Sequence, residues 1–233
     1  MGIIFSGLAY LTLAVFSAEV FAKTAILWRA ARSSLASGGG AAGATRPSCR
    51  AALKTTGDIF FLTRLLETND VLWFGELMFH WSFLFVVIRH LRYVLAPVPG
   101  CVSLLQTAGI IASYLLPAAL LYILIVKLAV ERSYAPLYNL SLLVLLLLLV
   151  ATGFMMTTAE RADIVAAKVF VLGLLHFAPQ AMPGNLFFSL HFILFLLLIL
   201  CLPTHIVAAP LIMFEARERE NHLRQILHNE HGG

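Results

Sequence analysis

Long runs of apolar residues, separated by shorter polar segments, dominate the pattern along this chain. Five runs are long enough for a helix of about 20 residues, the length that crosses the ~30 Å apolar core of a bilayer. We place them at roughly residues 3–28, 70–95, 104–130, 137–158 and 184–213. The pattern therefore predicts an all-α integral membrane protein built as a bundle of five transmembrane helices.

Two of the connecting segments have a character of their own. Residues 29–69 form a Gly-, Ala- and Ser-rich loop that carries basic residues. Residues 159–183 are longer than a turn requires and still apolar, which predicts a short interfacial helix at the outer membrane surface, ended by Pro179 and Pro183. We therefore expect one membrane domain over residues 1–213, followed by a charged, helical tail over residues 214–233.

Positive charge alternates between the two ends of the predicted spans. The basic residues on one side are Arg29, Arg32, Arg46, Arg50, Lys54 and Arg64 in the first connection, Lys127 and Arg132 in the third, and Arg217, Arg219 and Arg224 in the tail. Cytoplasmic loops carry the excess of Lys and Arg, so these segments are predicted to be cytoplasmic. This topology places the N-terminus outside and the C-terminus in the cytoplasm, as an odd number of spans requires.

Composition excludes several classes of function. The chain is 61% hydrophobic and 12% charged, unlike a soluble domain of this size, and its net charge of +4 is too small and dispersed to indicate nucleic acid binding. The three cysteines stand singly, without the CxxCH motif of c-type haem or a cluster for iron–sulfur or zinc. The first helix lacks a basic leader and a clear cleavage site, so we read it as retained. Because no residues for substrate chemistry are evident, the chain is expected to have no catalytic residue of its own.

Four histidines lie inside the predicted spans, where an ionisable group is costly and usually functional. His80 and His90 belong to the second span, and His191 and His205 to the fifth. On a helix the first pair is separated by a rise of about 15 Å and the second by about 21 Å, and each pair returns to within about 80° of one face. If the two spans are antiparallel, His90 and His191 lie at a similar depth in the membrane, and so do His80 and His205.

Two pairs of imidazoles on two opposed helices are explained by two stacked b haems, each iron taking one axial histidine from each helix. Helix tilt or bending at Pro203 and Pro210 would absorb the ~6 Å difference in rise. Two other interpretations remain. The histidines could form a proton relay in a haem-free transporter, although no internal repeat is evident. The chain could also be a membrane anchor without haem. The third and fourth spans contain no histidine, and we expect them only to enclose the haems as the walls of the site.

The chain carries the segment FGELMFHWSFLFVVIRHLRYVL, two following helices without histidine, and then the segment SLHFILFLLLILCLPTH. With these segments it resembles the NarI-like family of diheme cytochrome b subunits. That family includes the gamma subunit of respiratory nitrate reductase and the DsrM-type subunits of sulfur metabolism. The resemblance covers nearly the whole chain, and RHLRY is closer to the DsrM-type branch. It implies His90 and His191 as ligands of the distal haem, and His80 and His205 as ligands of the proximal haem.

The resemblance also implies a quinone or quinol as substrate, bound beside the distal haem. Here that position corresponds to Arg89, Arg92 and Tyr93, with His176 of the interfacial segment as a lid and proton acceptor, since imidazole titrates near neutral pH. A structural interpretation is also open, because Arg89 and Arg92 would reach lipid headgroups and Tyr93 would join the aromatic belt.

The resemblance implies a place in a larger complex as well. We expect an electron-transfer subunit of an oxidoreductase in the cytoplasmic membrane of a prokaryote. Its partner would be a cytoplasmic iron–sulfur subunit, ferredoxin-like or heterodisulfide-reductase-like, docked on the basic loop and tail.

Four further residues are candidates for a supporting role around the haems. Ser82, Ser189 and Thr204 are close enough in sequence to the histidines to bond to their rings. Gly75 would either let a porphyrin edge approach the backbone or serve helix packing.

Overall fold

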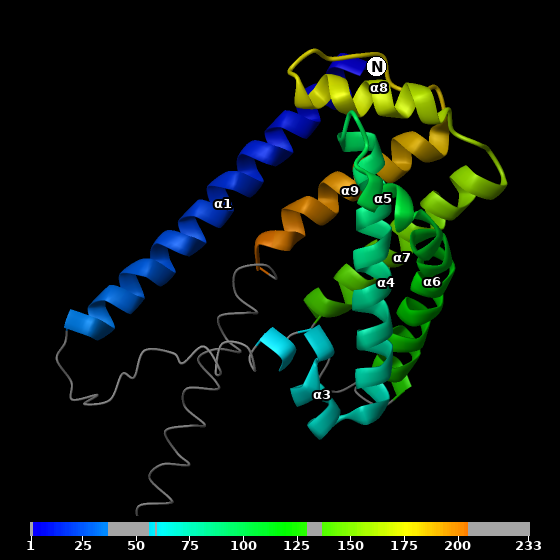
Figure 1. Ribbon diagram of the computed structural model, residues 1–233. Coiled ribbons are helices and arrows are strands. Elements are labelled where there is room, and N and C mark those ends of the chain that lie inside the picture. The colour runs from blue at the N-terminus through cyan, green and yellow to red at the C-terminus, as the bar shows by residue number, and fades with distance from the viewer. Residues whose placement is uncertain (1, 37–55, 59, 130–136, 205–233) are drawn as a thin grey trace, which may run out of the picture. The chain divides into compact units, whose positions relative to one another are not determined.

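The computed structural model describes residues 2–36, 56–58, 60–129 and 137–204 (Figure 1). Five of its helices are long and apolar enough to cross a membrane, which confirms the prediction of five spans. They are α1 (Gly2–Ala36), α4 (Asp70–Val94), α6 (Gln106–Ala129), α7 (Leu137–Thr158) and α9 (Leu186–Pro203). His205, Pro210, the tail 214–233, residues 37–55 of the first connection and residues 130–136 of the third lie outside the described residues.

The described residues fall into two compact units. The first comprises the N-terminal residues through Leu13 together with Phe61–Leu198, and it contains α4, α6, α7, a short helix α8 (Ile164–Leu175) and most of α9. The second comprises the rest of α1 with residues from Ile199 onward. In the second unit Lys23 donates a hydrogen bond to the hydroxyl of Thr204 (Nζ to Oγ1, 2.7 Å).

Helices α4 and α6 pack along each other and form the centre of the first unit (Figure 1). Helix α4 begins after Asn69, whose side chain accepts a hydrogen bond from the Leu72 amide at 2.9 Å, as an N-cap residue does. A Cβ on Gly75 would lie 2.5 Å from the Tyr122 ring, so this glycine allows the two helices to approach closely. Gly75 is therefore a helix-packing residue. Helix α7 packs on α6, and Ala119, Leu120 and Ile123 of α6 are almost fully buried.

Two short helices were not evident from the hydropathy pattern. Helix α3 (Thr63–Thr68) packs on α4 within the predicted first connection, and α5 (Gly100–Leu104) follows α4 after a turn that contains the Ala96–Pro97 bond. Both helices are shorter than seven residues, so they cannot produce a recognisable apolar period.

The connection between the fourth and fifth spans contains the short helix that the sequence predicts, α8. Asp163 caps it by accepting hydrogen bonds from the amides of Val165 and Ala166. The helix ends at Leu175, four residues before Pro179, because the chain turns at Phe177 (φ 55°) and folds back over Gly173. The proline at 179 is therefore not the helix terminator that we expected.

Helix α8 joins three parts of the chain at one end of the first unit. Phe170 of α8 is fully buried against Phe192 of α9, with ring centres 5.3 Å apart. The Tyr10 hydroxyl of α1 donates to the Leu174 carbonyl at 3.1 Å, and α8 also packs on α4. The N-terminal residues and the 159–183 connection thus share one end, as a five-span topology requires. The membrane face that this end occupies stays a prediction.

Candidate haem-binding site

The structure brings His90 of α4 and His191 of α9 together. Their ring centres are 6.4 Å apart, and the ring planes differ by only 15°. Both rings lie in the first unit, within spans that consist mostly of apolar residues. Two histidines separated by 101 positions in the sequence therefore meet as one pair.

Hydrogen bonds fix which nitrogen of each ring is available. The Nδ1 atom of His90 lies 2.7 Å from the Val86 carbonyl oxygen, and Nδ1 of His191 lies 3.0 Å from the Leu149 carbonyl oxygen. A carbonyl oxygen only accepts hydrogen bonds, so Nδ1 carries the proton in each neutral ring. The unprotonated Nε2 atom is then free to bind a metal, an arrangement that is typical of metal-ligating histidine.

The distance between the two ring centres is close to that expected for imidazoles on opposite sides of one iron. A metal–imidazole bond is about 2.0 Å long and the ring centre lies roughly 1.15 Å behind the bonded nitrogen, so rings on opposite sides of one metal have centres about 6.3 Å apart. The observed distance is 6.4 Å. Within the described part of the chain, no three His, Cys, Asp or Glu side chains gather as a metal-ion site. A haem iron needs only two protein ligands, because the porphyrin supplies the other four.

Helix α7 supports His191 directly, a role that the sequence did not reveal. The Thr152 hydroxyl lies 3.1 Å from Nδ1 of His191, and it also bonds to the Leu148 and Leu149 carbonyls. A Cβ on Gly153 would lie 3.2 Å from Cε1 of the same ring. The fourth span is therefore more than a wall. Its one sequence signal is the Thr–Gly pair that follows a run of leucines.

Two of the three hydroxyl residues considered from the sequence have other hydrogen-bond partners. Ser189 donates to the Asn185 carbonyl, and Thr204 accepts from Lys23. Ser82 is buried, and it lines a groove described below.

His80 lies on α4 and has its own set of neighbours. Its Nδ1 atom lies 2.6 Å from the Glu76 carbonyl oxygen, so Nε2 is again the free nitrogen. The Glu76 carboxylate lies 3.9 Å from the same Nδ1 and 3.4 Å from Nζ of Lys127 on α6. The expected partner, His205, lies outside the described residues, so the second pair stays a prediction.

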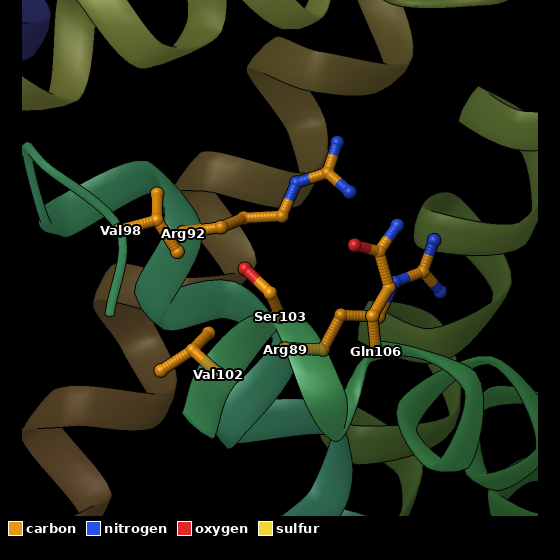
Figure 2. A pocket seen from close by; sticks show the side chains of 6 residues that line it. All are labelled: Arg89, Arg92, Val98, Val102, Ser103 and Gln106. Atoms are coloured by element: carbon orange, nitrogen blue, oxygen red, sulfur yellow. The ribbon is translucent and has the colours of Figure 1, made fainter. Parts of the chain in front are cut away.

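Two of the four predicted quinone residues line one small pocket at the end of α4. Arg89 and Arg92 project into it beside Ser103 and Gln106, with Val98 and Val102 as its apolar part (Figure 2). Its volume of about 20 Å³ is enough for about one water molecule. The Arg89 side chain passes over Gly109 of α6 on its way to the pocket. A Cβ on Gly109 would lie only 2.8 Å from the Cβ of Arg89.

The other two predicted quinone residues do not line this pocket. The Tyr93 ring lies 5.0 Å below the Arg92 guanidinium and 6.0 Å from the His90 ring. His176 caps α8, and its Nδ1 atom bonds to the Leu172 carbonyl oxygen. Three of the four residues are thus close to His90, and the fourth is on a helix that packs on α4.

A larger groove lies between α4 and α6, one helical turn from Arg89. Its volume is about 410 Å³, within the range of small-molecule sites. Buried Ser82 and Ala112 are among its lining residues, with aromatic side chains that include Phe74, Trp81 and Phe85. The groove is apolar and suits a hydrocarbon chain.

Fold and site together describe an all-helical protein with five candidate membrane spans, in which two histidine rings from different spans lie close together. The chain is similar to two archaeal proteins, each described as an Hdr-like menaquinol oxidoreductase cytochrome b-like subunit. The protein of Archaeoglobus profundus is 29% identical over 123 residues, which are 47% of this chain and 37% of the relative. The protein of Archaeoglobus fulgidus is 29% identical over 141 residues, which are 55% of this chain and 42% of the relative.

The aligned part thus covers about two fifths of each relative. No family model matches the chain, and no solved structure matches it. The relatives' names agree with the resemblance at the level of a membrane cytochrome b subunit, and neither name is that of a nitrate reductase subunit.

Proposed function

We propose that this chain is the cytochrome b subunit of a quinone-linked oxidoreductase in the cytoplasmic membrane of a prokaryote. It would bind two b haems, one through His90 and His191 and the other through His80 and His205. The observation that carries the proposal is the 6.4 Å separation of the His90 and His191 rings, each with its Nδ1 proton held by a carbonyl.

Bound haem supplies one-electron redox chemistry, and the surrounding residues would control its geometry. The Val86 and Leu149 carbonyls orient the two imidazoles and keep Nε2 unprotonated. Thr152 and Gly153 hold the His191 ring against α7. Such supporting groups typically change metal affinity 10- to 100-fold when they are removed.

Quinol or quinone would bind at the end of α4 that carries His90. Both relatives are named menaquinol oxidoreductase subunits, which supports a menaquinone-type substrate. Arg89, Arg92 and Gln106 offer hydrogen-bond donors to a quinone oxygen, and among the described residues neither arginine forms an ion pair with a carboxylate. The pocket admits about one water, so the headgroup would bind at its mouth, and the apolar groove would take the isoprenoid chain. Tyr93 would flank the headgroup, and His176 would accept a proton.

Electrons would pass between the quinone and a cytoplasmic iron–sulfur subunit. The relatives' description as Hdr-like supports a heterodisulfide-reductase-like partner. In this proposal the chain carries electrons and leaves the reduction of the final substrate to other subunits.

The test is haem binding in the full chain purified from membranes. We expect two low-spin haems per chain. His90→Ala and His191→Ala should each lose the same haem, and His80→Ala should lose the other one. His176→Ala, a histidine change at the end of α8, serves as the control and should keep both haems. Absence of haem from the purified chain would refute the proposal and favour a haem-free proton relay, and so would loss of different haems in the first two variants.

A further inference from the structure

An ion pair joins α4 and α6 near one end of both spans, with Lys127 in the last turn of α6. One carboxylate oxygen of Glu76 lies 3.4 Å from Nζ of Lys127, and their side chains are only 19% and 18% exposed. Charged side chains that are mostly buried in a membrane bundle are costly, and they are often functional. Pairing lowers this cost, yet a pair of apolar residues would be at least as stable, so stability alone does not explain the two charges.

The ion pair lies directly beside a proposed haem ligand. The second carboxylate oxygen of Glu76 is 3.9 Å from Nδ1 of His80, and the backbone carbonyl of Glu76 is 2.6 Å from the same atom. Lys127, Glu76 and His80 thus form a continuous row from α6 to the imidazole. Glu76 therefore both orients the His80 ring through its backbone carbonyl and places a negative charge next to that ring.

Charges at this range affect an iron on the other side of the ring. A carboxylate near the axial imidazole stabilises the ferric state, which carries one more positive charge than the ferrous state, whereas an ammonium group favours the ferrous state. The paired charges oppose each other, so the reduction potential depends on their balance.

We propose that the Glu76–Lys127 ion pair sets the reduction potential of the haem iron that His80 binds. Glu76 is a positioning residue that acts through the imidazole, and Lys127 is its counter-charge. The reaction concerned is the addition of one electron to ferric iron to give ferrous iron, with the electron supplied by quinol or by an iron–sulfur partner. This inference rests on the proposed function, because it requires a haem at His80.

Redox titration of the purified full chain tests the inference, with the His90–His191 haem as an internal reference. Glu76→Gln leaves Lys127 unopposed and should raise the potential of the His80 haem. Lys127→Met leaves Glu76 unopposed and should lower it, and the double variant should return close to the starting value. We expect each single change to alter the reduction equilibrium by about tenfold, which for one electron is about 59 mV.

The control is Asp70→Asn, a carboxylate change on the same helix about 15 Å from His80, and it should shift neither haem. The charge-swapped variant Glu76→Lys with Lys127→Glu keeps an ion pair and covers the case in which a single variant fails to fold. It should raise the potential, because it places the positive charge next to His80.

Three outcomes separate the possibilities. Opposite shifts in the single variants and a raised potential in the swapped variant support the inference. Two bound haems with unchanged potentials, or shifts of the same sign in both single variants, overturn it and leave the pair a structural element. A wild-type chain without haem at His80 refutes the proposed function instead.

Discussion

The contact between Gly153 and His191 allows a graded test of the histidine pair. A Cβ at position 153 would lie 3.2 Å from Cε1 of the ring, whereas carbon atoms in contact are about 3.5–4.0 Å apart. In Gly153→Ala the ring must therefore move by a few tenths of an ångström. In Gly153→Val a methyl group extends about 1.5 Å further, so the ring must move by roughly 2 Å. Metal-ligand distances tolerate changes of only about 0.2 Å.

We therefore expect Gly153→Ala to weaken binding of one haem about 10- to 100-fold and Gly153→Val to remove that haem. Haem per purified chain, measured from the reduced haem spectrum, should fall to about half in the valine variant. Gly7→Val in α1 is the matched control, because a Cβ there meets nothing within 4 Å. Two haems per chain with unchanged potentials in Gly153→Val would show that His191, in the position described, does not bind iron.

Four further predictions follow from other contacts. Thr152→Val removes the hydroxyl that lies 3.1 Å from Nδ1 of His191. Redox titration should show that both haems are retained and that the reduction potential of the His191 haem is raised, with the reduction equilibrium changed about fivefold. The control Thr152→Ser keeps the hydroxyl and should behave as wild type. Ala112→Phe fills the groove between α4 and α6 and should raise the KM for long-chain quinol but not for a short-chain analogue, in contrast to Leu121→Phe on the exposed side of α6. Arg92→Leu and His176→Ala should each slow haem reduction by quinol in a stopped-flow assay, and unchanged rates in both would remove these residues from the proposed quinone site. Phe170→Ala should lower the free energy of unfolding by about 3–5 kcal/mol, seen as earlier thermal loss of helicity, whereas the exposed Val165→Ala should change it little.

The sequence was sufficient for features that depend on the length of an apolar run or on the depth of a residue in the membrane. The five spans and the short helix α8 follow from runs of apolar residues whose length matches a bilayer or falls short of it. The meeting of His90 with His191 follows from the predicted antiparallel arrangement of the second and fifth spans, which places the two residues at a similar depth.

The other contacts between helices that matter for the site could not be predicted. Helical periodicity shows which face of a helix is apolar but not which neighbour that face meets, so it did not reveal that Thr152 and Gly153 pack on His191. Glu76 and Lys127 are 51 positions apart, and only the packing of α4 on α6 brings them together. Lys127 contributed to the predicted topology as a loop charge, whereas the structure places it in the last turn of α6 with its ammonium group against the Glu76 carboxylate.

The hydrogen bond from Tyr10 to Leu174 has a consequence for biosynthesis. Its two residues are separated by 164 positions, and ribosomes add about 5–20 residues per second. The first helix therefore resides in the bilayer for roughly 8–33 s before its binding surface on α8 has been translated. This end of the protein can therefore close only after the connection between the fourth and fifth spans has been synthesised.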